Sequence, residues 1–155
     1  MGKTTQDLSE LENYFSSLTE LATKQVEYGF YDEQHYSGLN MATLAAIHEQ
    51  GWHNLPERNF IYSTAALYNE NLSKHLKNMH KAIVAKRPYS PYLQKIGRDG
   101  AASIKYTIQQ GTFSNPKVSR KWAAVKGFDD AMIHYGDLSE AATFKVVKYN
   151  RSEEG

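Results

Sequence analysis

The six histidines are the first residues of this chain that could bind a metal ion or carry a proton. The segment AIHEQGWH superficially matches a zinc-protease motif through His48 and His53, and His75 and His80 form a second pair. That motif needs histidines four residues apart, so that both imidazoles leave one helical face toward one ion. His48 and His53 are five residues apart, with Gly51 between them and Trp52 at the fourth position, and His75 and His80, also five apart, diverge by about 140° around a helix. The spacing therefore predicts no metal site, and we expect no cofactor.

Local patterns for covalent or phosphate chemistry are also missing from the sequence. There is no GxSxG-type turn, and Ser103 in GRDGAAS falls within a predicted helix. Phosphate-binding loops of the GxxxxGKS or GxGxxG kind do not occur, and the absence of cysteine removes thiolate nucleophiles and disulfides. Asp129 and Asp130 are adjacent, so their side chains diverge on a helix or a strand. We therefore expect a protein that is not an enzyme, with a hydrolase site built from distant residues as a remote third alternative.

Length and composition predict one folded domain over residues 1–155. A chain of 155 residues with 41% hydrophobic and 23% charged residues is close to the globular average. No apolar run approaches the roughly 18 to 20 residues that span a bilayer, and the first residues, MGKTTQDLSE, lack the apolar core of a secretory signal. We expect neither membrane association nor export.

Charge is strongly segregated along the chain, although the formal net charge is only +1. Residues 1–34 contain seven acids and two lysines, whereas residues 74–126 contain twelve basic residues and one acid, Asp99. A field of this size can steer an anionic partner. The candidate residues for a subunit interface or a DNA-facing surface are Lys74, Lys77, Lys81, Lys86, Arg87, Lys95 and Arg98.

Hydrophobic periodicity predicts four helices. Apolar residues three and four apart indicate an amphipathic helix from Asp7 to Thr23, and the spacing of Asp7 and Glu10 is that of a capping box. A second helix should follow an Asn40 cap and end at Gly51, and a long one should run from Phe60 to before Pro88. The fourth should begin at the Ser-Pro pair of residues 90–91 and reach Gly111, weakened by glycines at 97 and 100.

Two short segments rich in β-branched and aromatic residues, 26–31 (VEYGFY) and 142–149 (ATFKVVKY), predict strands. Residues 117–136 fit no class clearly, and residues 151–155 should form a flexible tail. The expected fold class is therefore α+β, with a small, mainly antiparallel sheet packed against the long helix of residues 60–87 and against shorter helices.

Two blocks of the sequence resemble the neck and tail-completion proteins of tailed bacteriophages, a family of virion morphogenesis and minor structural proteins. The first block is NMATLAAIHEQGWHNLPERNF, residues 40–60, which is similar to a helix of the form ATLAAIHEFG followed by an IPERPF corner. The second is KGFDDAMIHYGDLSEAATFKVV, residues 126–147, similar to a pLIDTGxLxxSIxxxV ending. The resemblance covers residues 26–147 and leaves the N-terminal helix, residues 1–24, outside it. Asn59 departs from the usual proline, and His134 and Tyr135 depart from the usual Asp-Thr pair.

The residues shared with these blocks suit structural roles. In the first block a glycine ends the helix and a proline fixes the chain direction. A Glu-Arg pair is available for ion pairing, and a phenylalanine anchors the long helix. In the second, Gly136 permits a tight turn and Asp137 can cap the short DLSEAA turn. The structural residues of the two blocks are Gly51, Pro56, Glu57, Arg58, Phe60, Gly136 and Asp137.

The resemblance implies a virion protein of the head-tail junction, assembled in the host cytoplasm. Such a neck or tail-terminating protein would form a homo-oligomeric ring that joins the head connector to the tail, with the tail terminator and tail tube as further neighbours. The alternative from the residues alone is a small DNA-binding protein with a basic surface. In a ring, the lysines would lie partly buried at subunit contacts or stay wet around passing DNA. The acidic N-terminal helix would pack either on its own subunit or on the next one.

Overall fold

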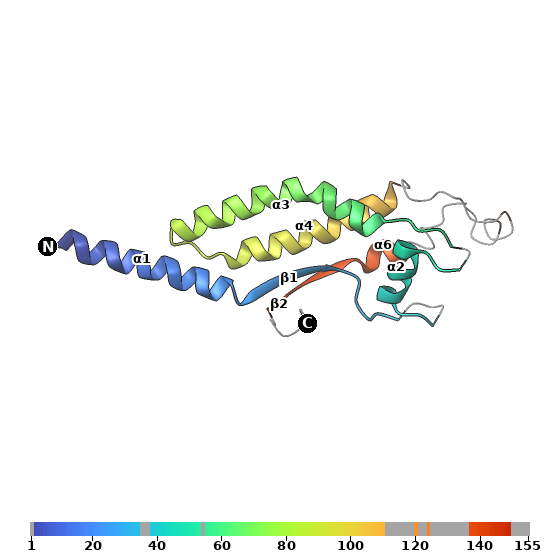
Figure 1. Cartoon of the computed structure of the whole chain (residues 1–155), viewed down its shortest axis with the longest axis horizontal. Helices are drawn as coiled ribbons and strands as arrows, with labels where there is room; N and C mark the ends of the chain where they lie inside the picture. The colour runs from blue at the N-terminus through green and yellow to red at the C-terminus, as the bar shows by residue number, and fades with distance from the viewer. Residues whose placement is uncertain are drawn as a thin grey trace.

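The computed structural model describes residues 2–34, 38–53, 55–110, 120, 124 and 137–149, with side chains from residue 8 onward. Its elements in chain order are α1 (Gly2–Leu21), β1 (Lys24–Gly29), α2 (Met41–Gln50), α3 (Phe60–Val84), α4 (Ser90–Gln109), α6 (Asp137–Ala141) and β2 (Thr143–Lys148). Helices α3 and α4 form an antiparallel hairpin beside the β1–β2 ribbon, with α2 and α6 at one end and α1 extending from the other (Figure 1). The predicted α+β class is confirmed.

The strands pair antiparallel, so that Val26 lies opposite Val146 and Tyr28 opposite Phe144. Side chains alternate between the two faces of a sheet, and these two pairs therefore share one face. Helix α4 packs against the ribbon, and α3 packs in turn on α4. Helix α3 reaches the sheet through Tyr68, whose ring meets Tyr28 edge-on at 5.7 Å between centroids. Helix α4 thus covers most of the ribbon, whereas the sequence predicts this role for the long helix of residues 60–87.

Two glycines on α4 explain how closely the helix approaches the sheet. A Cβ atom at Gly97 would lie 2.6 Å from Cγ of Phe144, and one at Gly100 would lie 2.7 Å from Cγ of Tyr28. Both distances are far below a van der Waals contact between carbon atoms. The sequence suggested that these glycines weaken the helix; in the folded protein they are the positions that admit the aromatic rings of β1 and β2.

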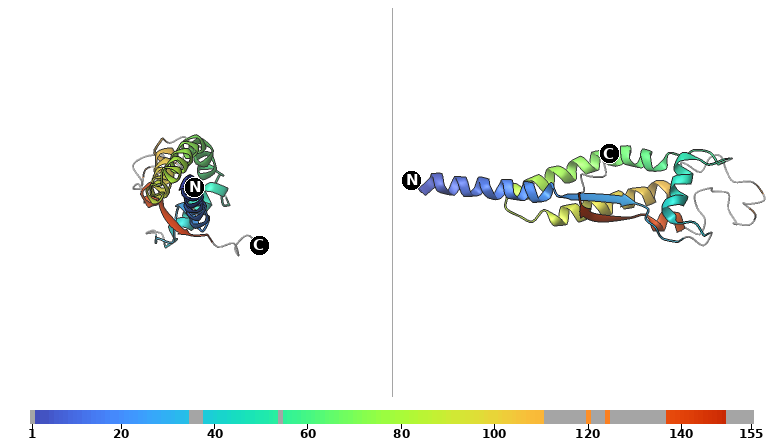
Figure 2. Two further views of the ribbon diagram at one scale, coloured as in Figure 1. Left: turned by 90° about the vertical axis from the view of Figure 1, so that its left-hand side faces the viewer. Right: turned by 60° about the horizontal axis from the view of Figure 1, so that its bottom comes forward.

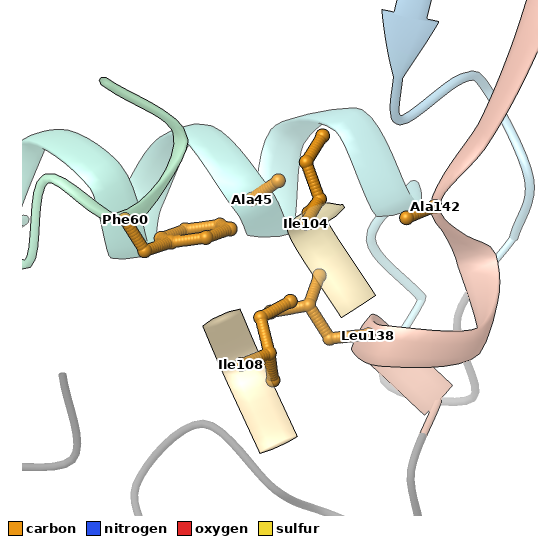
Figure 3. Close-up of a cluster of buried hydrophobic side chains, with 6 residues drawn as sticks. All are labelled: Ala45, Phe60, Ile104, Ile108, Leu138 and Ala142. Carbon is orange, nitrogen blue, oxygen red and sulfur yellow. The ribbon is translucent and has the colours of Figure 1, made fainter. Parts of the chain in front are cut away.

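The buried core has two clusters at opposite ends of the hairpin. In one, side chains from α2, α4, α6 and the start of α3 converge (Figure 3). The other lies at the turn between α3 and α4 and receives partly buried side chains of α1 and both strands. The first cluster comprises Ala45, Phe60, Ile104, Ile108, Leu138 and Ala142. The second, the hairpin-turn cluster, comprises Met79, Ile83, Tyr89 and Leu93.

Some predicted element ends are confirmed, whereas the start of α1 and both ends of β1, which spans Lys24–Gly29 against the predicted 26–31, are wrong. The Asn40 side chain caps α2 by accepting the N–H of Thr43 at 2.7 Å, and α3 ends at Val84, before Pro88. Helix α1 begins at Gly2, so the capping box predicted at Asp7 is wrong. Strand β1 begins two residues earlier than predicted, because main-chain pairing with β2 does not require β-branched side chains there.

Candidate assembly surfaces

The corner between α2 and α3 is built from residues of the first resembling block. Gly51 follows α2 with φ 75°, and a Cβ there would lie 2.8 Å from the Leu55 carbonyl oxygen. The positive φ and the close backbone together explain why this position holds glycine. Of the other two residues in this corner, Pro56 is half-buried and Glu57 is exposed.

The end of the same corner is buried. The Arg58 side chain is only 6% exposed, and its backbone N–H donates to the His48 carbonyl at 3.1 Å. Phe60 is fully buried in the α2–α6 end of the core, as expected of an anchor for the long helix. In the second block, α6 begins at Asp137, which agrees with the predicted helical turn, whereas Gly136 lies outside the described residues.

Helix α3 receives an N-terminal cap that the sequence did not suggest. Asn59 precedes the helix in a left-handed conformation, with φ 49°, and its side chain makes no capping hydrogen bond. The Glu49 carboxylate instead accepts the N–H of Ile61 at 2.7 Å and that of Tyr62 at 3.0 Å. A carboxylate at this point satisfies two first-turn amides and suits the positive end of the helix dipole.

Replacing Glu49 with alanine should lower the free energy of unfolding by about 1 to 2 kcal/mol, the usual effect of losing a helix cap. The two first-turn amides lose their acceptor while α2 keeps a good helix former. Urea denaturation measures the change. The matched control is Gln50→Ala at the neighbouring exposed position, and equal stabilities for the two variants would contradict the cap.

The histidines at positions 75 and 80 have separate partners on different helices. Nε2 of His75 lies 2.9 Å from an Asp99 carboxylate oxygen, which Lys95 also approaches at 3.0 Å. Nε2 of His80 lies 3.0 Å from the Tyr14 hydroxyl. Within the described ranges, no group of three or more possible metal ligands comes together. The Asp99 cluster therefore links α3 to α4, and the Tyr14 contact links α1 to α3.

Beside the Asp99 cluster, Tyr68 is buried between α3 and α4. Its hydroxyl donates to the Ile96 carbonyl at 2.9 Å, and its side chain is only 2% exposed. Burial, with smaller contributions from the charges of Asp99 and Tyr28, raises the pKa of Tyr68 to about 12. The neutral phenol is therefore strongly favoured in the folded protein.

This burial predicts a loss of stability in alkali. Unfolded tyrosine has a pKa near about 10, so between about pH 10 and pH 12 the folded state binds more protons than the unfolded state. The stabilisation from Tyr68 is complete below the lower value and is lost as the pH rises through the upper one. Tyr68→Phe should therefore lose less stability than the parent between about pH 9 and pH 11.5 in urea denaturation. Equal losses of stability in Tyr68→Phe and the parent would contradict this account. Burial also raises the pKa values of Tyr28 and Tyr31, so the stability of Tyr68→Phe should still fall in part as the pH rises.

The seven candidate basic residues are all exposed in the single chain. Three make ion pairs: Lys74 with Glu70, Lys86 with Glu10 and Lys95 with Asp99. Lys77, Lys81, Arg87 and Arg98 make no ion pair with any residue in the described part of the chain. Over residues 60–109 the hairpin carries eight basic residues and two acids, a net charge of +6.

Helix α1 packs on its own subunit through one side of its C-terminal half. Tyr14 bonds to His80, and Nζ of Lys86 lies 2.7 Å from the Glu10 carboxylate. Tyr14, Leu18 and Leu21 pack against the hairpin-turn cluster. The first residues of α1 continue past the turn between α3 and α4, as Figure 1 and the right-hand view of Figure 2 show. The sequence left open whether this helix packs on its own subunit or on the next one. Packing on its own subunit is observed from Glu10 onward.

The periodic apolar residues that predict α1 divide into two groups: Leu18 packs on the hairpin-turn cluster, whereas Leu8, Leu11 and Phe15 do not face the body of the protein. Leu8, Leu11 and Phe15 are 57%, 50% and 56% exposed. Tyr14 contacts α3 through His80, and the Phe15 ring meets the Tyr14 ring edge-on, with 5.7 Å between centroids, on the outer side of that contact. These three residues, the apolar stripe of α1, are thus left exposed, Leu8 and Leu11 on the N-terminal half of α1 and Phe15 on the half that packs on the hairpin.

A groove between α3 and α4 is a second exposed surface. It encloses about 520 Å³ and is lined in part by the small residues Thr64, Ala102 and Ser103. Leu67 and Tyr106 also line it, and they are 76% and 63% exposed. The groove is at the part of the hairpin far from the turn that α1 contacts, because its α3 residues precede residue 72 and its α4 residues follow residue 98.

Comparison of the chain with protein-family models, with curated proteins and with solved structures finds no match. Among the described residues, no helix is long and apolar enough to cross a membrane.

Proposed function

We propose that this protein is a non-enzymatic structural subunit of a tailed-bacteriophage neck or tail-completion ring. One observation carries the proposal: a single chain presents an acidic helix with an exposed apolar stripe and, on a different surface, a strongly basic hairpin. The similarity of residues 40–60 and 126–147 to that family also supports this proposal.

The charges favour contact between unlike surfaces of neighbouring copies. Helix α1 carries four acids and one lysine, a net charge of −3, whereas the hairpin of residues 60–109 carries +6. A contact between two different surfaces is head-to-tail, and such contacts generate a ring when the rotation closes. Charge complementarity of this kind fixes orientation and accelerates association.

In a virion, the ring would lie between the head connector and the tail, with the tail terminator or tail tube on its other side. Assembly would take place in the host cytoplasm before the particle is complete. Basic residues left free by subunit contacts would face the DNA that passes through the junction, and would bind its phosphates without reading sequence.

A specific observation favours the second candidate function, a small DNA-binding protein. Lys77, Lys81, Arg87 and Arg98 are exposed and have no acidic partner among the residues that the structure describes. Free basic groups of this kind bind the DNA backbone and lose affinity as salt rises.

Light scattering combined with gel filtration separates the two candidates. For a ring held by charge and apolar contacts, the mass at about 0.1 M salt should be a fixed multiple of the monomer and should fall at about 1 M salt. A monomer or dimer at every concentration, together with salt-sensitive binding to a labelled DNA duplex, would contradict the ring and support the alternative.

A further inference from the structure

The outer side of α1 carries apolar side chains that the described part of its own subunit leaves exposed. An isolated helix of this length is marginal in water, and most helical stability in proteins comes from packing of an apolar face. Here the apolar residues Leu8, Leu11 and Phe15 are at least half exposed. The helix also extends away from the body, beyond the turn between α3 and α4 (Figure 1).

The groove between α3 and α4 has the features of a helix acceptor. Small residues at Thr64, Ala102 and Ser103 let another helix approach closely, and Leu67 and Tyr106 offer exposed apolar surface. Binding of an amphipathic helix in an apolar groove is a common mode of recognition, in which anchors three and four residues apart enter the groove. Leu8, Leu11 and Phe15 have that spacing.

Charge around the groove complements the acidic helix. Lys74 follows Asn71 by three residues on α3, and Arg98 precedes Ala102 by four on α4, so each borders the groove. Asp99, the acidic residue that lines the groove, is itself engaged by His75 and Lys95. On α1, Glu12 is exposed and makes no ion pair in the portion of the chain that is described. It stands about 60° around the helix from Phe15, at the border of the stripe.

The groove of the same subunit is out of reach. Helix α1 contacts its own hairpin near the turn, through Tyr14 to His80 and Glu10 to Lys86. Its first residues continue from there in the direction opposite to the groove, which lies toward the α2–α6 end (Figure 2). An α1 helix in this groove must therefore come from a second molecule.

We propose that Leu8, Leu11 and Phe15 of α1 dock in the α3–α4 groove of the next copy of this chain. Each subunit donates its helix to one neighbour and receives a helix from another, so the contact is head-to-tail and not a two-fold exchange. This inference rests on the proposed ring and names the two surfaces that hold it together. It also assigns Lys74 and Arg98 to the subunit contact, and leaves Lys81 and Arg87 for other partners.

Disulfide trapping tests this docking directly, because the chain contains no cysteine of its own. Phe15→Cys protein is mixed with Tyr106→Cys protein under mild oxidation, and we expect a covalent dimer on a non-reducing gel. The Phe15→Cys/Tyr106→Cys double variant should give a ladder of higher multiples, since every copy carries both surfaces. A second pair, Leu8→Cys with Leu67→Cys, guards against damage to the stripe by any one substitution.

The matched control is Ser16→Cys with Tyr106→Cys, because Ser16 is exposed and turned about 100° from Phe15. It should give little cross-linked product. Rings that form without cross-links at either pair would overturn the docking while leaving the ring function intact. Neither rings nor cross-links would overturn both, and cross-linking within one chain or only as a closed dimer would overturn the head-to-tail arrangement.

Discussion

Replacing Gly97 with alanine should lower the free energy of unfolding by about 3 kcal/mol or more, the scale of a severe overpacking change. In an ordinary helix interior the same substitution stabilises by about 1 kcal/mol, since alanine has the higher helix propensity. The effect on the free energy of unfolding reverses in sign here, because the new Cβ would lie 2.6 Å from Cγ of Phe144, a residue of β2 whose ring packs against α4. Urea denaturation followed by circular dichroism measures the effect.

A double-mutant cycle separates this clash from a general defect of α4. Phe144→Ala removes the ring and is destabilising by itself, but in that background Gly97→Ala should become neutral or stabilising. Gln94→Ala, at an exposed position of the same helix, should change little. If Gly97→Ala were as harmful without the Phe144 ring as with it, the close approach would not be the cause.

Replacing Phe15 with aspartate should abolish self-assembly and leave a folded monomer. Phe15 is the largest side chain of the exposed stripe, and a carboxylate in its place would lose the apolar contact and approach Asp99, which lines the groove. Loss of a central aromatic anchor typically costs about 2 to 4 kcal/mol, so self-association should weaken by about 30- to 1,000-fold. Gel filtration with light scattering should show the monomer mass at concentrations where the parent protein is oligomeric.

Ser16→Asp is the matched control for that substitution. It adds the same charge at the next residue, on an exposed side of α1 that the docking does not use. Its mass distribution should match that of the parent, and both variants should keep the parent's helical circular dichroism and melting temperature. An oligomeric Phe15→Asp protein would exclude the stripe as a contact between subunits.

Much of the fold was predictable from local patterns. The long helix α3 was found from its periodic apolar residues and from Pro88, and the Asn40 cap from the preference for a side-chain oxygen before a helix. The glycines of α4 were misjudged because helix propensity describes an isolated helix. What a glycine admits, here the rings of Phe144 and Tyr28, depends on strands far away in the sequence.

The candidate surfaces were predicted only in part. Segregated charge pointed to the basic residues, and the spacing of Leu8, Leu11 and Phe15 revealed an apolar stripe. The sequence could not predict which side of α1 meets the body, because that side is set by a hydrogen bond between Tyr14 and His80, which is 66 residues away in the chain. The Glu49 cap and the α3–α4 groove were missed for the same reason: both exist only after α2, α3 and α4 have packed.

Negative-stain electron microscopy of the purified protein tests the central claim most directly. We predict closed rings of one size, each subunit repeated by rotation, in samples at low salt where apolar and charged contacts act together. The Phe15→Asp variant on the next grid should show no rings. Isolated monomers or two-fold dimers of the parent protein, with no rings at any protein concentration, would contradict the claim that this chain is a ring-forming subunit.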